Sequence, residues 1–299
     1  MTDGKDGLVI VDKPGGMTSH DVVARIRRLA GTRRVGHAGT LDPMATGVLV
    51  VGVDKATRVL GYLALTQKQY DATIRLGQST STDDAEGELT ATASAKDVSE
   101  QTINQAVKTL TGEIQQVPPA VSAIKVDGQR AYKLTRAGAA PELKPRPVTV
   151  YEFTVTGIRT AGDGDLIDVD ATVRCSSGTY IRALARDLGD KLGTGGHLTA
   201  LRRTRVGGYG LDAAKTLDQL AERFEVMPLA QAAAAAFGRR DLSADEARRL
   251  AHGGRLAPGG PPGAGPPGPT AAFAPDGTLI ALLTEDSGQA RPLVVFAGS

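Results

Sequence analysis

Short apolar runs typical of buried strands alternate along this chain with segments of helical periodicity, without a regular strand–helix–strand repeat. The expected strands are residues 8–11 and 48–53, and a hairpin formed by 151–158 and 166–173. The expected helices begin after Thr18 or Ser19 and end at Gly31, begin at Ser99 and end at Gly112, and cover 179–188 with Gly189 behind. This irregular mixture favours an α+β protein, with a mixed sheet flanked by helices.

The C-terminal 60 residues have a different composition. Ser243 to Glu246 has the pattern of a capping box that opens a short helix. Residues 257–270 contain 11 Gly or Pro in 14 positions, which predicts a flexible loop. Three short strands are expected beyond it, at 271–274, 279–284 and 293–296. The sequence therefore predicts a main domain over residues 1–238 and a small β-rich module over residues 239–299.

Composition limits the class of protein. The single cysteine, Cys175, has no intramolecular disulfide partner and cannot build a cysteine-based zinc cluster; we expect it to be buried and structural. No apolar run approaches the roughly 20 residues of a membrane span. The first residues lack the pattern of a signal peptide. We therefore expect a cytoplasmic enzyme or binding protein with no membrane partner.

Basic residues are clustered although 35 Lys and Arg nearly balance 33 Asp and Glu. Five arginines and no acid lie between Val22 and Leu41. Such a cluster is compatible with a solvated helix face, and also with a surface that binds a polyanion. Arginine suits phosphate because its guanidinium binds two oxygens at once.

A glycine-rich segment over 36–47, Gly-His-Ala-Gly-Thr-Leu-Asp-Pro-Met-Ala-Thr-Gly, is the most informative stretch. Pro43 restrains Asp42 to an extended backbone just before an apolar run. An Asp-Pro pair in a loop is commonly only a turn former. Near the arginine cluster, however, the charged form of this carboxylate is favoured, which suits a nucleophile or a base.

This segment resembles the catalytic motif of the bacterial tRNA pseudouridine 55 synthases, the TruB family. Four further blocks are similar in order and spacing over about 200 residues: Gly7–Pro14 with Thr18-Ser19, Lys68-Gln69-Tyr70, Pro118–Lys125 with Gly128, Arg130 and Tyr132, and Gly178–Arg182 followed by Leu201-Arg202-Arg203. The resemblance implies the pseudouridine synthase fold, a mostly antiparallel mixed sheet flanked by helices, with a small C-terminal module like a PUA domain.

The resemblance also implies a reaction and its catalytic residues. Uridine 55 in the T stem-loop of tRNA would be flipped out of its stack and isomerised to pseudouridine. Asp42 would be the catalytic aspartate, Tyr70 would stack on the uracil and assist proton transfer, and Arg182 would pair with Asp42. The isomerisation is redox-neutral and releases nothing, so we expect no cofactor and no metal. Whether Asp42 attacks C1′, attacks the ring or removes a sugar proton stays open.

Substrate-binding positions follow from the same resemblance. His37 would fill the gap left by the flipped nucleotide, and Tyr180 and Leu201 would line the pocket. Residues 117–147 would form a mobile insertion that grips the RNA. The other expected RNA contacts are Arg58, where many relatives carry lysine, and Lys125, Arg130 and Arg202. Binding through phosphates predicts a strong dependence on salt.

Two other functions fit the same residues. The chain could be an RNA chaperone that opens the T loop, with or without chemistry. It could also be a relative that acts on ribosomal RNA with a guide RNA, although the lysine-rich tails frequent in those relatives are absent here. The intact Asp42, Tyr70 and Arg182 favour a stand-alone enzyme that needs no guide RNA. We expect it to be a monomer.

Overall fold

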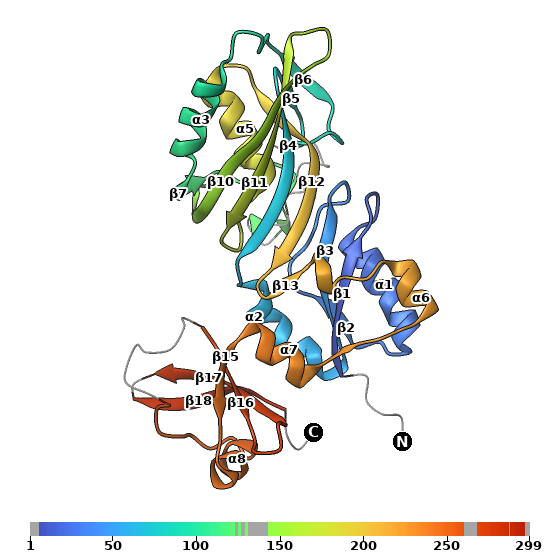
Figure 1. Ribbon diagram of the computed structural model, residues 1–299, viewed down its shortest axis with the longest axis vertical. Helices are drawn as coiled ribbons and strands as arrows, with labels where there is room; N and C mark the ends of the chain where they lie inside the picture. Colours follow the sequence, from blue (N-terminus) through green and yellow to red (C-terminus); the bar gives the residue numbers. More distant parts are fainter. Residues whose placement is uncertain are drawn as a thin grey trace. The chain divides into compact units, whose positions relative to one another are not determined.

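The computed structural model describes residues 6–122, 125–126, 129–130, 143–259, 268–286 and 288–296, with the backbone alone for 125–126, 129–130 and 286. The chain separates into two compact units (Figure 1). The first consists of Met1–Asp42, Gly47–Leu65 and Val206–Ser299. The second consists of Pro43–Thr46 and Thr66–Arg205. The architecture is the expected α+β fold with mostly antiparallel strand pairs and a C-terminal β module.

The strands at the start of the first unit are antiparallel and apolar. β1 (Gly7–Lys13) pairs with β3 (Thr46–Val53) along its whole length. β2 (Val35–His37) pairs with the end of β3, and β14 (Met227–Pro228) with the start of β1. Each fully buried aliphatic side chain in such strands contributes roughly 1.5–3 kcal/mol to folding. The strands β1 and β3 contain the apolar runs at 8–11 and 48–53, so both strands expected from the sequence are confirmed.

Helix α1 (Ser19–Ala30) has the ends that the sequence predicts. The Thr18 hydroxyl accepts a hydrogen bond from the Asp21 N–H, and the Asp21 carboxylate accepts one from the Thr18 N–H, which completes a capping box. Gly31 ends the helix at φ 68°, in the left-handed region that glycine tolerates. Helix α1 packs beside α6 (Leu217–Glu222), next to β1 (Figure 1).

The rest of the first unit includes the C-terminal module. The shorter elements of the first unit outside this module include η1 (Asp54–Val59), α2 (Leu60–Ala64), β13 (Tyr209–Gly210), η2 (Leu211–Ala213) and α7 (Leu229–Ala236). The module itself is a sheet in the order β15 (Gly238–Asp241), β16 (Thr270–Phe273), β17 (Leu279–Asp286) and β18 (Gln289–Val295), with α8 (Ala244–Ala251) against β17 and β18. The three expected strands and the capping box at Ser243 are confirmed. The sequence patterns did not reveal β15, which pairs with β16 in parallel.

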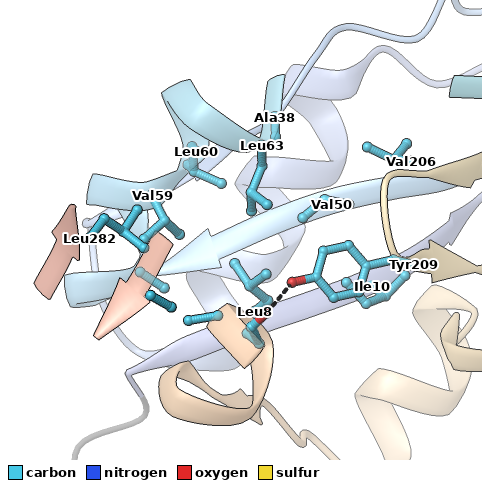
Figure 2. Close-up of a cluster of buried hydrophobic side chains, with 14 of the residues drawn as sticks. Leu8, Ile10, Ala38, Val50, Val59, Leu60, Leu63, Val206, Tyr209 and Leu282 are labelled. Carbon is cyan, nitrogen blue, oxygen red and sulfur yellow. Dashed lines mark hydrogen bonds between the residues drawn. The ribbon is translucent and has the colours of Figure 1, made fainter. Parts of the chain in front are cut away.

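The module shares a hydrophobic core with the N-terminal strands. Leu282 belongs to the same buried cluster as Leu8 and Val59 (Figure 2). Phe273 of β16 is part of this cluster as well. In this cluster the Tyr209 hydroxyl donates a 2.7 Å hydrogen bond to the Ala232 carbonyl, which satisfies its one polar atom. The predicted domain boundary at residue 238 stays a prediction.

The second unit is a long antiparallel sheet with two helices. Strand β12 (Gly196–Val206) is followed in the sheet by β4 (Lys68–Leu76), β11 (Leu166–Cys175), β10 (Arg146–Ala161) and β7 (Gly112–Gln116). Helices α3 (Glu100–Thr109) and α5 (Ile181–Leu192) pack on each other, α3 against β10 and α5 against β4 (Figure 1). Two short ladders pair β5 (Gln78–Thr80) with β6 (Leu89–Thr92) and β8 (Lys125–Val126) with β9 (Gln129–Arg130). The predicted hairpin at 151–173 is confirmed, with longer strands.

Two predicted helix ends were wrong. The helix opened by Ser99 ends at Thr109 with Leu110 as its C-cap, and Gly112 instead begins β7. Helix α5 continues to Leu192 and is capped by Gly193, so Gly189 lies inside it. A Cβ on Gly189 would meet the Gly195 carbonyl carbon at 2.1 Å. This glycine is therefore required by a close backbone approach, which its sequence spacing does not show.

Candidate active site

The loop that carries Asp42 is fixed by the start of helix α1. The Leu41 N–H donates a 2.9 Å hydrogen bond to Ser19 Oγ, and Ser19 Oγ donates a 3.1 Å hydrogen bond to the Leu41 carbonyl. Gly39 and Gly47 adopt φ values of 88° and 99°, which an L side chain rarely accepts. Asp42 itself is half-buried. The backbone next to Asp42 is thus anchored through the buried Leu41, and Asp42 is not fully buried.

His37, expected to contact RNA, ends β2 in the same unit as Asp42. Its ring meets that of His20 edge to face, with centroids 5.5 Å apart and planes at 86°. His20 lies in the first turn of α1 and is exposed. The sequence did not connect these two histidines, because His20 is at the start of α1 and His37 is at the end of β2, the next element.

Arg58, another expected RNA contact, is exposed at the end of η1. Its guanidinium lies 5.3 Å from the centroid of the Phe296 ring, which is a cation–π contact. Arg58 is therefore oriented by the aromatic ring that follows the last strand of the C-terminal module.

Tyr70 lies on β4 in the second unit and is 7% exposed. It is opposite Val173 of β11, and the buried side chains on its face of the strand include Lys68 and Ala72. Because strand residues two apart share a face, the Lys-x-Tyr block places its lysine and tyrosine on the same side of the sheet.

Arg182 stands in the first turn of α5 and forms a buried ion pair. Its Nε lies 3.4 Å from Asp84 Oδ2, and both side chains are 5% exposed. Its Nη1 donates to the Thr82 carbonyl at 2.8 Å, and its Nη2 donates to the Val121 carbonyl at 3.0 Å. Sequence reasoning missed Asp84; the pair of acids that follows Thr82 and precedes Gly87 was the available signal. The predicted pairing of Arg182 with Asp42 joins residues of different units and stays a prediction.

Tyr180, expected to line the pocket, is the N-cap residue of α5. Its N–H donates to Gln116 Oε1 at 2.8 Å, and its carbonyl accepts from Gln116 Nε2 at 3.1 Å. Gln116 is 1% exposed. The backbone at the start of α5 is therefore fixed to the end of β7, which leaves the half-buried Tyr180 ring on a rigid support.

Leu201 and Arg202 lie on β12, and Leu201 is 6% exposed. The Nη1 of Arg202 donates a 3.2 Å hydrogen bond to Thr46 Oγ1, four residues after Asp42 in the sequence. Arg202 is thus linked to the end of the glycine-rich motif. Side chains of Lys125 and Arg130, and most of the predicted insertion at 117–147, lie outside the described residues.

Lys68 and Cys175 are opposite each other on β4 and β11 and are both buried. Burial, together with the charge of Arg203, lowers the pKa of Lys68 to about 8. Burial raises the pKa of the Cys175 thiol to about 11. The expectation that Cys175 is buried is confirmed, and its raised pKa disfavours the reactive thiolate.

No group of three or more metal-ligating side chains occurs among the residues that the structure describes. In the same residues no helix is long and apolar enough to cross a membrane.

Family models match consecutive parts of the chain. A model described as "TruB family pseudouridylate synthase (N terminal domain)" matches residues 27–181. A "tRNA pseudouridylate synthase B C-terminal domain" matches residues 182–232, and a "tRNA Pseudouridine synthase II, C terminal" model matches residues 237–297.

Curated relatives and solved structures agree with these matches. The chain is 66% identical over 296 residues to tRNA pseudouridine synthase B of Thermobifida fusca (strain YX), covering 98% of this chain and 99% of the relative. It is 62% identical over 299 residues to the protein of the same name from Arthrobacter sp. (strain FB24), covering 98% and 97%. It is also similar, at TM-score 0.73 and 29% identity, to a chain of a Cbf5-Nop10-Gar1 complex, covering 99% of this chain and 84% of that one. A chain of an H/ACA RNP bound to a substrate RNA containing 2′-deoxyuridine matches at TM-score 0.73 and 26% identity, covering 98% and 85%. On these similarities over nearly its full length, the chain belongs to the TruB family of pseudouridylate synthases.

Proposed function

We propose that this protein is a tRNA pseudouridine synthase that isomerises uridine 55 in the T stem-loop of tRNA. The single observation that carries the proposal is the half-buried Asp42 on a loop pinned by Ser19, in a chain 66% identical to a tRNA pseudouridine synthase B. Because the backbone that carries Asp42 is already ordered, the loop loses little conformational entropy when a flipped nucleotide binds.

The reaction rearranges one nucleoside. The bond from N1 to C1′ breaks, the uracil turns, and a bond from C5 to C1′ forms. C5 loses its proton and N1 gains one, so that atoms and electrons balance without an external acceptor. The protein must therefore supply a carboxylate, a group that handles the C5 proton, and a pocket for the base. We expect no cofactor and no metal.

Three residues carry the chemistry in this proposal. Asp42 is the catalytic carboxylate. Tyr70 stacks on the uracil and assists transfer of the C5 proton. Arg182 keeps Asp42 ionised, because a neighbouring guanidinium favours the charged form of a carboxyl group. The ion pair with Asp84 and the two carbonyl contacts fix the direction of the Arg182 side chain.

RNA binding in this proposal uses His37, Tyr180, Leu201, Arg58, Arg202 and the insertion at 117–147 with Lys125 and Arg130. Flipping one base costs a few kcal/mol, which stacking and hydrogen bonds in the pocket must offset. The enzyme acts as a monomer in the cytoplasm without a guide RNA. Its affinity for tRNA should fall steeply as salt increases, because bound phosphates release counterions.

The decisive experiment is Asp42→Asn. We expect pseudouridine formation in a tRNA transcript to fall by at least about 100-fold, with tRNA affinity retained. Asp212→Asn, an exposed acid of η2, is the control and should keep full activity. Conversion by Asp42→Asn at the normal rate would remove Asp42 from the reaction.

A second experiment separates a stand-alone enzyme from a guide-dependent one. The purified protein is incubated with a bare T stem-loop and no other RNA, and pseudouridine is measured. Conversion supports the proposal. Tight binding of the stem-loop without conversion would instead favour the RNA chaperone.

A further inference from the structure

Arg186 of α5 holds a backbone carbonyl outside its own helix. Its Nη2 donates a 2.7 Å hydrogen bond to the Val117 carbonyl, the residue directly after β7. Its Nη1 donates to Asp83 Oδ2 at 3.0 Å. Its Nε and Nη2 donate to Asp187 Oδ1 at 3.0 and 2.8 Å. Two carboxylates therefore hold the guanidinium plane in a fixed orientation, with one N–H directed at Val117.

The carboxylates that hold Arg186 are themselves partly removed from water. The side chains of Asp83, Arg186 and Asp187 are 15%, 24% and 26% exposed. Asp83 has a φ of 59°, a left-handed conformation uncommon for a residue other than glycine. The ion pair with Arg186 is one of the contacts available to keep the loop in this conformation. Partial burial makes these charge-assisted hydrogen bonds stronger than a surface pair.

The segment held by Arg186 has few hydrogen-bond donors of its own. After Val117 come two prolines, 118–119, which carry no N–H. Beyond the prolines, Arg182 Nη2 donates a hydrogen bond to the Val121 carbonyl at 3.0 Å. Arg182 and Arg186 are four residues apart and so lie on the same face of α5. Helix α5 thus fastens the chain on both sides of the prolines.

The same two arginines reach one acidic loop. Arg182 pairs with Asp84, and Arg186 pairs with Asp83, the neighbouring residue. The backbone path after β7 and the surroundings of Arg182 are therefore linked through a continuous set of ion pairs and hydrogen bonds. A change at Arg186 can alter the path of the chain while the Arg182 contacts are retained.

We propose that Arg186 is a positioning residue for RNA binding: it sets the path by which the chain leaves β7 toward residues 123–142. This inference rests on the proposed function, which assigns the insertion at 117–147 to RNA contact. Arg186 acts through the Val117 carbonyl and touches no reacting atom. Its loss should therefore weaken substrate binding and leave the chemical step in place.

The test compares Arg186→Met and Arg186→Lys with the wild-type protein. Methionine is unbranched and removes every donor; lysine keeps the charge that Asp83 and Asp187 face but lacks the fork that also reaches Val117. Steady-state conversion of a T stem-loop gives kcat and KM. We expect KM to rise about tenfold for both variants, with kcat within about twofold of wild type, because the lost charge-assisted hydrogen bond to the Val117 carbonyl positions the RNA-binding segment and takes no part in the chemical step.

A matched control and a second measurement keep the test decisive. Arg159→Met removes another arginine of the same unit that pairs with two carboxylates, Asp168 and Asp170, and it should leave KM unchanged. Trypsin cleavage after Lys125 and Arg130 should be faster in both Arg186 variants than in Arg159→Met. If Arg186→Met fails to fold, the KM of Arg186→Lys alone tests the role of Arg186.

Two results would overturn the inference. The first is an unchanged KM in both Arg186 variants, whether or not their melting temperature falls, and the second is a fall in kcat alone. The proposed function is tested separately by the wild-type protein: if that protein forms no pseudouridine, the function fails, whereas an active wild type with an unaffected Arg186→Lys variant rejects only the role of Arg186.

Discussion

Arg182 and Asp84 form an ion pair in which Nε and Oδ2 are 3.4 Å apart and each side chain is 5% exposed. The pair joins the first turn of α5 to the loop between β5 and β6. Removing one partner of a buried pair leaves the other charge uncompensated, which costs about 3–5 kcal/mol. The pair is therefore important mainly because it fixes where the Arg182 guanidinium lies.

Asp84→Asn should lower the free energy of unfolding by about 3 kcal/mol, because Arg182 loses its anionic partner while its carbonyl contacts remain. Urea unfolding measures this change. Pseudouridine formation, assayed where the variant is fully folded, should fall as well. Asp71→Asn, an exposed acid on β4, is the control. A loss below about 0.5 kcal/mol for Asp84→Asn would show that the pair is not a significant support.

Ser19→Ala should release the loop that carries Asp42. The buried N–H and carbonyl of Leu41 would lose the Ser19 hydroxyl as a partner, at about 1–3 kcal/mol for each unsatisfied group. We expect the free energy of unfolding to fall by about 2–4 kcal/mol and kcat to fall with it. Ser99→Ala, which removes a helix cap from α3, should cost about 1 kcal/mol with normal kcat. Equal kcat in the two variants would contradict the anchoring role of Ser19.

Lys68 should make stability depend on alkaline pH. Burial lowers its pKa from 10.5 to about 8, so between these values the unfolded chain binds more protons than the folded one. Its contribution to the free energy of unfolding must therefore rise with pH across this window, by up to about 1.4 kcal/mol per pH unit. Burial raises the pKa of Cys175 from 9.0 to about 11, so its contribution falls with pH over that range and opposes the rise.

The cleanest window lies below the range in which Cys175 acts, from about pH 8 to about pH 9. Urea unfolding of the wild type and of Lys68→Met at these two values should give a stability difference, wild type minus variant, that increases by about 1 kcal/mol. Lys96→Met, at an exposed lysine, should give the same difference at both values. A flat difference for Lys68→Met would mean that Lys68 keeps its proton in the folded state.

Cys175 should be unreactive in the folded protein. With a thiol pKa of about 11, roughly one molecule in a thousand carries the thiolate at pH 8, and the side chain is fully buried. Labelling by a thiol-specific disulfide reagent should be at least about 100-fold slower than in urea. Cys175→Ala should keep the pseudouridine-forming activity. Rapid labelling accompanied by inactivation would argue for a thiol in the reaction.

The sequence was sufficient to predict features that depend only on residues close together along the chain. Thr18 and Gly31 define α1, because the cap residue and the left-handed glycine act within one turn of the helix. The β10–β11 hairpin was also expected from the sequence. The burial of Asp168 on β11 was not: this acid is 6% exposed, and Arg75 binds both of its carboxylate oxygens. The motif around Asp42 identified the family without any coordinates, and Asp42 as its catalytic carboxylate stays a prediction.

Only the tertiary structure decided which distant residues support these local features. Asp84 contacts Arg182 across 98 positions of sequence, and Ser19 contacts Leu41 across 22. Contacts between residues so far apart produce no hydrophobic periodicity from which they could be predicted. Gly189 resembles a helix stop in the sequence, yet it lies inside α5, and the close approach of the Gly195 backbone is what requires glycine there. The sequence determines strands, helix caps and reactive groups because these depend on neighbours along the chain. Burial, ion pairs and close backbone contacts depend on neighbours in space, and they exist only once the chain has folded.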